Sequence, residues 1–140
     1  MSPGVAPPSL PASAGPCDDA VGPTAPNPPV APAAGQVFVG SGSAFFIGTA
    51  GHRWRENVVY EHNTYFSKIG IYTLDPRPPA VTVRRVDGPG VGRIDFAPTS
   101  QGLPGWLPTG VYYTSPGCWE VIARGTKGQA TIHVLVEARR

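Results

Sequence analysis

The chain has unusually few charged residues. Charged residues make up 14% of its 140 residues, well under the quarter that soluble domains usually carry, and the formal net charge is only +2. The arginines are scattered rather than gathered into a stripe, so the electrostatic footprint of a nucleic-acid-binding protein is missing. No apolar run approaches the roughly 18 residues of a membrane-spanning helix. The composition therefore argues against a nucleic-acid partner and against a membrane span.

The residues that hydrolytic enzymes need are also sparse. Only nine acidic residues occur, and two of them, Asp18 and Asp19, lie in a proline-rich segment. No Gly-x-Ser-x-Gly nucleophile elbow is present. The glycine-rich stretch 87–92 lies between two strand-like runs, whereas a phosphate-binding loop must lead into a helix. We therefore expect no catalytic residue, no cofactor and no enzymatic activity.

Proline and glycine, by contrast, are abundant, with 18 of each. The prolines crowd into the first 32 residues, together with Ala, Ser and Gly. Such a composition favours an extended polyproline geometry and cannot build a core of its own. The sequence therefore predicts an extended Pro-rich strap or linker over 1–35 and a folded domain over 36–140.

The folded part consists of short apolar runs separated by turn signals, with no helical periodicity. Runs rich in Val, Ile, Tyr and Phe predict strands within 36–49, 56–74, 79–86, 91–98, 118–125 and 130–140, and a long loop at 99–110. The last two runs form the clearest hairpin, because Ile132, Val134 and Val136 alternate with more polar positions. The fold class is all-β, an antiparallel β-sandwich of about seven to nine strands.

The two cysteines, Cys17 and Cys118, stand 101 positions apart, and several roles are open to Cys118. A zinc or iron site needs several Cys or His ligands at close spacing, which neither cysteine has. A nucleophile needs a helix N-terminus or a nearby base, whereas Cys118 opens a strand just before Trp119. A free buried thiol remains an alternative. A disulfide with Cys17 is favoured because it would hold the strap on the domain, and it indicates an oxidising compartment.

Three segments resemble parts of a group of uncharacterised bacterial exported or lipoprotein-type domains. LPTGVYYTSPGCWEVIARGTKGQATIHVLVE (107–137) resembles the C-terminal hairpin of that group, and its specific core is Pro116–Val121. CDDAVGPTAPNPP (17–29) is similar to the opening of those domains, and PPAVTVRRVDGPG (78–90) to their mid-domain strand and turn.

The resemblance covers most of 17–140 and implies an immunoglobulin-like sandwich, a Cys17–Cys118 disulfide and export, but no specific activity. The sequence departs from the group at GVYYTS (110–115) and at GHRWRENVVYEHN (51–63). A function specific to this protein would lie in those departures.

Histidines and carboxylates offer one weak metal hypothesis. His52, His62 and His133, with a carboxylate such as Glu61, would suit copper or zinc if the fold brought them together. The simpler interpretation is three unrelated surface imidazoles, so we expect no metal site.

Aromatic residues beside arginines are the most suggestive group, because exposed Trp and Tyr can form a platform for a sugar ring, a peptide or a protein. Trp54 between two arginines is the best candidate for a surface anchor. The alternative is that Trp106 and Trp119 cap the two ends of the core. The candidate binding residues are Arg53, Trp54, Arg55, Trp106 and Tyr112.

We therefore expect a non-enzymatic, exported structural or binding module of the cell envelope, located outside the cell or at its surface. No signal peptide is recognisable in the chain itself. Two alternatives remain: a self-assembling extracellular filament or surface subunit that uses the N-terminal arm, and a glycan-binding module that uses exposed aromatics. The expected partner is protein, including other copies of this chain.

Overall fold

The computed structural model describes residues 17–97 and 102–139. Within these residues the chain forms nine strands and one short 3₁₀ helix, and no helix long and apolar enough to cross a membrane. The elements are β1 (Gln36–Ser41), β2 (Ala44–Thr49), η2 (Trp54–Asn57), β3 (Val58–Glu61), β4 (Thr64–Thr73), β5 (Ala80–Arg85), β6 (Arg93–Phe96), β7 (Gly105–Tyr113), β8 (Gly117–Arg124) and β9 (Gln129–Val136). The all-β prediction is confirmed.

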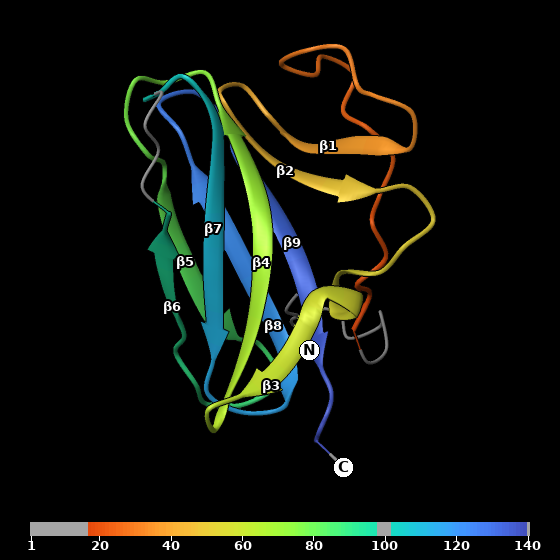
Figure 1. The fold of residues 1–140 in the computed structure, drawn as a ribbon, viewed down its shortest axis with the longest axis vertical. Coiled ribbons are helices and arrows are strands. Elements are labelled where there is room, and N and C mark those ends of the chain that lie inside the picture. Colours follow the sequence, from red (N-terminus) through yellow and green to blue (C-terminus); the bar gives the residue numbers. More distant parts are fainter. Residues whose placement is uncertain (1–16, 98–101, 140) are drawn as a thin grey trace, which may run out of the picture.

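The strands form two antiparallel sheets that pack face to face (Figure 1). The large sheet has the order β1–β2–β4–β7–β6, with β3 also paired to β4, and the small sheet has the order β5–β8–β9. With β4–β7–β6 facing β5–β8–β9, this is the strand order of the immunoglobulin fold, in which strands B, E and D face C, F and G. The predicted antiparallel immunoglobulin-like sandwich is therefore confirmed.

One edge of β4 is shared by two short strands. β2 pairs with the last part of β4, through Ala44–Ile47, and β3 pairs with its first part, through Val58–Glu61. Between them η2 fills the interruption and turns Trp54 inward. This break in the strand places the segment 50–57 against both the sheet and the strap.

The core lies between the two sheets and follows the period-two alternation of the strands. The buried side chains of β9 are Ala130, Ile132, Val134 and Val136. Trp119 on β8 is fully buried and packs edge-to-face on Tyr113, with 5.5 Å between the ring centroids. The buried hydroxyl of Tyr113 shares a hydrogen bond of 2.8 Å with Ser67 Oγ, so this polar group is satisfied inside the core.

The predicted long loop at 99–110 is wrong over most of its length, although 99–101 lie outside the described residues. β7 begins at Gly105 and runs through the middle of the large sheet. Pro108 fits there because its carbonyl accepts a hydrogen bond from the N–H of Ala97 at 3.0 Å, where β6 has just ended. Its ring nitrogen points to the same side, so the missing N–H costs at most the last bond of the β6–β7 ladder.

The described part of the predicted strap, residues 17–35, contains no strand and runs past η2 up to β1 (Figure 1, red to orange). The N–H of Ala25 donates to the carbonyl of Phe38 at 2.7 Å, and Thr24 Oγ1 accepts from the N–H of Phe38 at 3.1 Å. The strap thereby occupies the outer edge of β1. Residues 1–16 lie outside the described residues.

Candidate functional site

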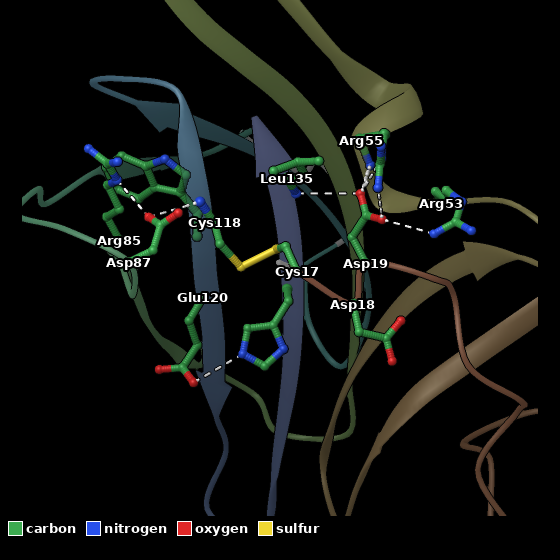
Figure 2. Close-up of a disulfide and its surroundings, with 12 residues drawn as sticks. Cys17, Asp18, Asp19, Arg53, Arg55, Arg85, Asp87, Cys118, Glu120 and Leu135 are labelled. Carbon is green, nitrogen blue, oxygen red and sulfur yellow. Dashed lines mark hydrogen bonds and ion pairs between the residues drawn. A yellow bond between two sulfur atoms is a disulfide. The ribbon is translucent and has the colours of Figure 1, made fainter. Parts of the chain in front are cut away.

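The two cysteines form a disulfide, with 5.7 Å between their Cα atoms (Figure 2). It joins the strap to the start of β8, as both the residue argument and the resemblance predict. On the other side of Cys118, its backbone N–H donates to Asp87 Oδ1 at 3.1 Å, and the same oxygen accepts from Arg85 Nε at 2.7 Å. Cys118 is therefore a structural residue, held by a covalent bond and by a charged turn.

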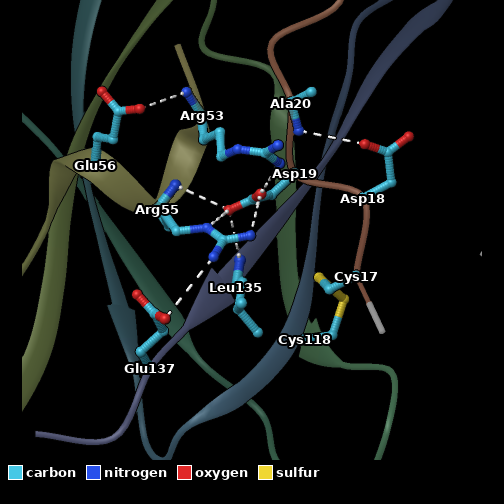
Figure 3. A network of polar contacts seen from close by, with 10 residues as sticks. All are labelled: Cys17, Asp18, Asp19, Ala20, Arg53, Arg55, Glu56, Cys118, Leu135 and Glu137. Carbon is cyan, nitrogen blue, oxygen red and sulfur yellow. Dashed lines mark hydrogen bonds and ion pairs between the residues drawn. A yellow bond between two sulfur atoms is a disulfide. The ribbon is translucent and has the colours of Figure 1, made fainter. Parts of the chain in front are cut away.

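The carboxylate of Asp19 is fully buried and lies at the centre of the polar network in Figure 3. Its Oδ2 accepts hydrogen bonds from the backbone N–H of Arg55 (3.2 Å) and from Arg55 Nε (2.9 Å), and its Oδ1 accepts from Arg55 Nη2 (2.9 Å). Arg53 Nη1 donates to Oδ1 at 3.4 Å, and the backbone N–H of Leu135 donates to Oδ2 at 3.4 Å. One carboxylate therefore joins the strap to η2 and to the edge of β9.

The charge state of this network follows from its contacts. Burial raises the pKa of Asp19, but the hydrogen bonds and charge of Arg55 and the N–H of Leu135 outweigh it and hold the pKa below its usual value. The hydrogen bond and charge of Asp19 in turn raise the pKa of Arg55 against the opposing effect of desolvation. The pair is ionised, and removal of one partner would leave the other poorly compensated.

The structure thus assigns Arg53 and Arg55 to the attachment of the strap. Trp54 between them is only 3% exposed and belongs to the core, so the prediction of a surface anchor there is wrong. A Cβ atom at Gly48 would lie 2.8 Å from the ring of Trp54, which shows how closely the indole covers that strand. The physical reason is that Asp19 draws the two flanking guanidinium groups to one side, while the apolar ring fills the break between β2 and β3.

A second buried carboxylate, Asp75, has a similar structural role at the other end of the sandwich. Its Oδ2 accepts from Ser43 Oγ and from the N–H of Thr126, both at 2.9 Å. Its Oδ1 accepts from Thr126 Oγ1 at 2.5 Å. The hydrogen bonds from Thr126 lower the pKa of Asp75 against the effect of burial. These contacts join the β1–β2 turn, the end of β4 and the β8–β9 turn.

The three histidines lie apart. His52 Nδ1 pairs with Glu56 Oε1 at 2.7 Å on the surface, and His133 Nε2 pairs with Glu120 Oε2 at 3.4 Å on the small sheet. His62 occupies the tight β3–β4 turn with a φ of 52°. Within the part of the chain that the structure describes, no group of three or more His, Cys, Asp or Glu residues is arranged to hold a metal ion.

The remaining candidates, Trp106 and Tyr112, both lie on the side of the large sheet that faces away from the small one. The outward residues of β4 and β7 form this outer face, and they are Phe66, Lys68, Gly70, Tyr72, Trp106, Pro108, Gly110 and Tyr112. Trp106 is 49% exposed, so it does not cap the core. Trp106 and Tyr112 are six positions apart on one strand, which separates them by roughly 20 Å.

Two rings of the outer face lean over glycines of the neighbouring strand. A Cβ atom at Gly70 of β4 would lie 2.7 Å from the six-membered ring of Trp106, which belongs to β7. The arrangement is reciprocal, because a Cβ atom at Gly110 of β7 would lie 2.8 Å from the ring of Phe66 on β4. Rings that lean across a sheet in this way cover backbone on one side and leave their other side toward solvent.

Charged side chains interrupt this aromatic surface. The guanidinium carbon of Arg93 lies 3.8 Å from the centroid of the Tyr112 ring, and that ring is 4.8 Å from the ring of Phe66. Arg93 also pairs with Asp95 at 3.1 Å. Lys68 is exposed between the Trp106 end and the Tyr112 end. The outer face therefore combines aromatic rings with hydrogen-bonding groups of both signs.

An open pocket of about 260 Å³ borders the Tyr112 end of the outer face, where it is lined in part by Phe66 and Tyr112. A second pocket, of about 360 Å³, lies beside η2 and the strap and is lined in part by Val21, Arg53 and Trp54. The polar and titratable residues that line these two pockets are Gln36, Thr49, His52, Arg53, Glu56, Asn57, Glu61, His62 and Thr64.

Sequence reasoning found Trp106 and Tyr112 but missed the residues that complete their surface, namely Phe66, Lys68, Gly70, Gly110 and Arg93. A usable signal was present, because in YFSKIGIYT the buried Ser67, Ile69 and Ile71 alternate with the outward positions. The contribution of β7 was missed because the glycines and proline of this strand were interpreted as part of a loop.

The chain matches no protein-family model, no curated protein and no solved structure. The resemblance carried by Pro116–Val121 therefore remains a hypothesis, and function has to be argued from the residues themselves.

Proposed function

We propose that the protein is a non-enzymatic, exported structural or binding module of the bacterial cell envelope. The observation that carries the proposal is the Cys17–Cys118 disulfide, because structural disulfides persist in oxidising compartments and are rare in the cytosol. The same chemistry supports an extracellular or cell-surface location.

The use of the polar residues supports a binding or structural role over a catalytic one. The buried carboxylates Asp19 and Asp75 are occupied by hydrogen bonds that join separate parts of the chain. In contrast, the exposed Trp106 and the half-buried Phe66 and Tyr112 lie on one open sheet face. Such a division between a rigid scaffold and an open aromatic surface is typical of binding modules.

The alternative, a self-assembling subunit that places its N-terminal arm on a neighbouring copy, receives less support. Residues 17–25 are already bonded to β1, η2, β8 and β9 of their own domain. An arm engaged in this way does not offer those residues to the exposed strand of another copy.

Thiol trapping combined with cell fractionation tests the proposal. Cells that carry the protein are treated with an alkylating reagent before lysis, and the envelope, external and cytosolic fractions are analysed by intact mass. We expect the protein outside the cytosol with no reagent attached, and a sample alkylated after reduction supplies the mass standard. Recovery from the cytosol with both cysteines alkylated would contradict the proposal.

A further inference from the structure

We propose that the outer face of the large sheet is a glycan-binding site, on which sugar rings of a polysaccharide stack against Trp106 and against the Phe66–Tyr112 pair. The inference rests on the proposed binding role and names its ligand class. It places the ligand on a surface built by β4 and β7 and interrupted by Lys68.

The exposure of Trp106 is the first argument. Of the three tryptophans, Trp54 and Trp119 are buried in the core, while Trp106 keeps about half of its surface in contact with solvent. Tryptophan is among the most costly side chains to leave exposed, since it can bury about 150–250 Å². The packing of the Trp106 ring over Gly70 explains the position of the ring. It does not explain why the other side of the ring is exposed to solvent on a surface that carries further aromatic residues.

The chemistry of a sugar ring matches what surrounds these aromatics. One side of a pyranose ring presents C–H groups, which pack on an aromatic face, and its edge presents hydroxyls that both donate and accept hydrogen bonds. Lys68 and Arg93 supply donors, and Asp95 supplies acceptors, beside the rings. The pocket at the Tyr112 end adds a carboxylate and an imidazole, those of Glu61 and His62.

Two other occupants fit this surface less well. The centre of a protein–protein interface is depleted in Lys and Asp, whereas Lys68 stands in the middle of the outer face and Asp95 at its side. Single-stranded nucleic acid also stacks on aromatic platforms but needs clustered cations for its phosphates. Here Arg93 is already paired with Asp95, and the chain carries a net charge of only +2.

The spacing of the platforms favours a chain of linked rings over a single sugar. Gly70 and Gly110, which lie beneath the two leaning rings, are separated by two residues along the sheet and one strand across it. This corresponds to roughly 8 Å between their Cα atoms. A ligand that contacts both platforms gains from their combination, because the second contact becomes intramolecular. We therefore expect oligosaccharides to bind more tightly than their monomers.

The experiment uses the oxidised full chain and defined probes. Retention on insoluble cellulose, chitin and xylan is measured first, and cellohexaose, chitohexaose and xylohexaose are then titrated while tryptophan fluorescence is recorded, with glucose, N-acetylglucosamine and xylose as monomers. We expect retention on at least one polymer, and a fluorescence change with its hexamer at lower concentration than with its monomer. Trp106→Ala should weaken binding about tenfold or more and remove the fluorescence change.

Tyr60→Ala is the matched control. Like Tyr112, Tyr60 packs against a second aromatic ring and an arginine. Its ring centroid lies 4.8 Å from that of Tyr65 and 4.8 Å from the guanidinium carbon of Arg139. Tyr60 differs from Tyr112 because it lies on the side of the large sheet that faces the core. This variant should bind as tightly as the original protein. The thermal midpoint of each variant confirms that it is folded.

Four outcomes would overturn the glycan site: no retention on any polymer, equal losses in both variants, binding of oligodeoxythymidine in place of the sugars, or a dimer that Trp106→Ala converts to monomer. If the protein is nevertheless oxidised and outside the cytosol, the proposed module stands and only its ligand is wrong. A reduced cytosolic protein would contradict the module whatever sugar it bound.

Discussion

The strap side of the sandwich and the outer face of the large sheet each place a tryptophan over a strand glycine, but the two arrangements differ in what surrounds the ring. On the strap side, Trp54 covers Gly48 and is itself covered, with 3% of its surface exposed. On the outer face, Trp106 covers Gly70 and remains 49% exposed. The same local contact is thus part of the core in one place and part of the surface in the other.

The difference lies in what holds each region together. The strap side is closed by a disulfide, by the ion pairs of Asp19 and by hydrogen bonds to β1 and β9. These contacts occupy strand edges that would otherwise be open to pairing with another chain. The outer face is stabilised mainly by the sheet beneath it. Substitutions on the strap side should therefore change the free energy of unfolding, and substitutions on the outer face should change binding.

The largest expected effect comes from the disulfide. The double substitution Cys17→Ser/Cys118→Ser should lower the free energy of unfolding by about 4–5 kcal/mol, because the bond spans a sequence separation of 101 residues. Urea denaturation of both proteins, followed by fluorescence, measures the change. A loss below about 1 kcal/mol would mean that the strap is held mainly by its other contacts.

The next effect concerns the ion pairs. Asp19→Asn should lower the free energy of unfolding by about 2–3 kcal/mol, because the buried site loses the charge that Arg55 faces. Asp18→Asn is the matched control, since Asp18 is exposed and its Oδ1 accepts only a long bond of 3.4 Å from the N–H of Ala20. It should change stability by less than about 0.5 kcal/mol. Equal effects of the two substitutions would show that the network contributes nothing specific.

Acid should remove the same contribution gradually. The pKa of Asp19 is lower in the folded protein than its ordinary value of about 3.9, so its contribution is complete above that pH and is lost as pH falls below about 4 toward the folded pKa. The stability difference between the original protein and Asp19→Asn should therefore stay constant from neutral pH down to about pH 4 and shrink below that pH. Asp75 and Asp87 also have lowered pKa values, and the comparison with the variant separates their effect from that of Asp19. A difference that grows in acid would contradict an ionised Asp19.

The smallest effect sharpens the comparison between the two tryptophans. Gly48→Ala should destabilise the protein by about 1–3 kcal/mol, because the added methyl group meets the buried Trp54 and the strap residue Val21. Gly70→Ala should cost less than about 0.5 kcal/mol, because Trp106 can swing outward into solvent. Urea denaturation measures both values, and acrylamide quenching should increase only for Gly70→Ala. Equal costs would show that Trp106 is held as firmly as Trp54.

Much of the fold could be predicted from local patterns in the sequence. Alternation with a period of two predicted the strands from Gln36 onward, and the cleanest alternation, at Ile132, Val134 and Val136, marks the hairpin that the structure contains. The role of the cysteines could also be predicted. The chain has only two cysteines, they lie far apart in the sequence and they lack the spacing of metal ligands, so a disulfide was the favoured role. The 105–113 strand was missed because proline and glycine are loop signals unless their place in the sheet is known.

The sequence by itself determined the fold class, the position of most strands and the chemistry available to the two cysteines, because each follows from residues that are near one another or are unique in the chain. Only the tertiary structure decided which tryptophan is exposed. Neither the arginines beside Trp54 nor the glycine and prolines around Trp106 predict the exposure of the ring. The difference arises from distant partners: Asp19 and Val21 close over Trp54, while Gly70 on the neighbouring strand supports Trp106 from beneath. The exposure of a ring depends on what packing places above it, and that information lies elsewhere in the chain.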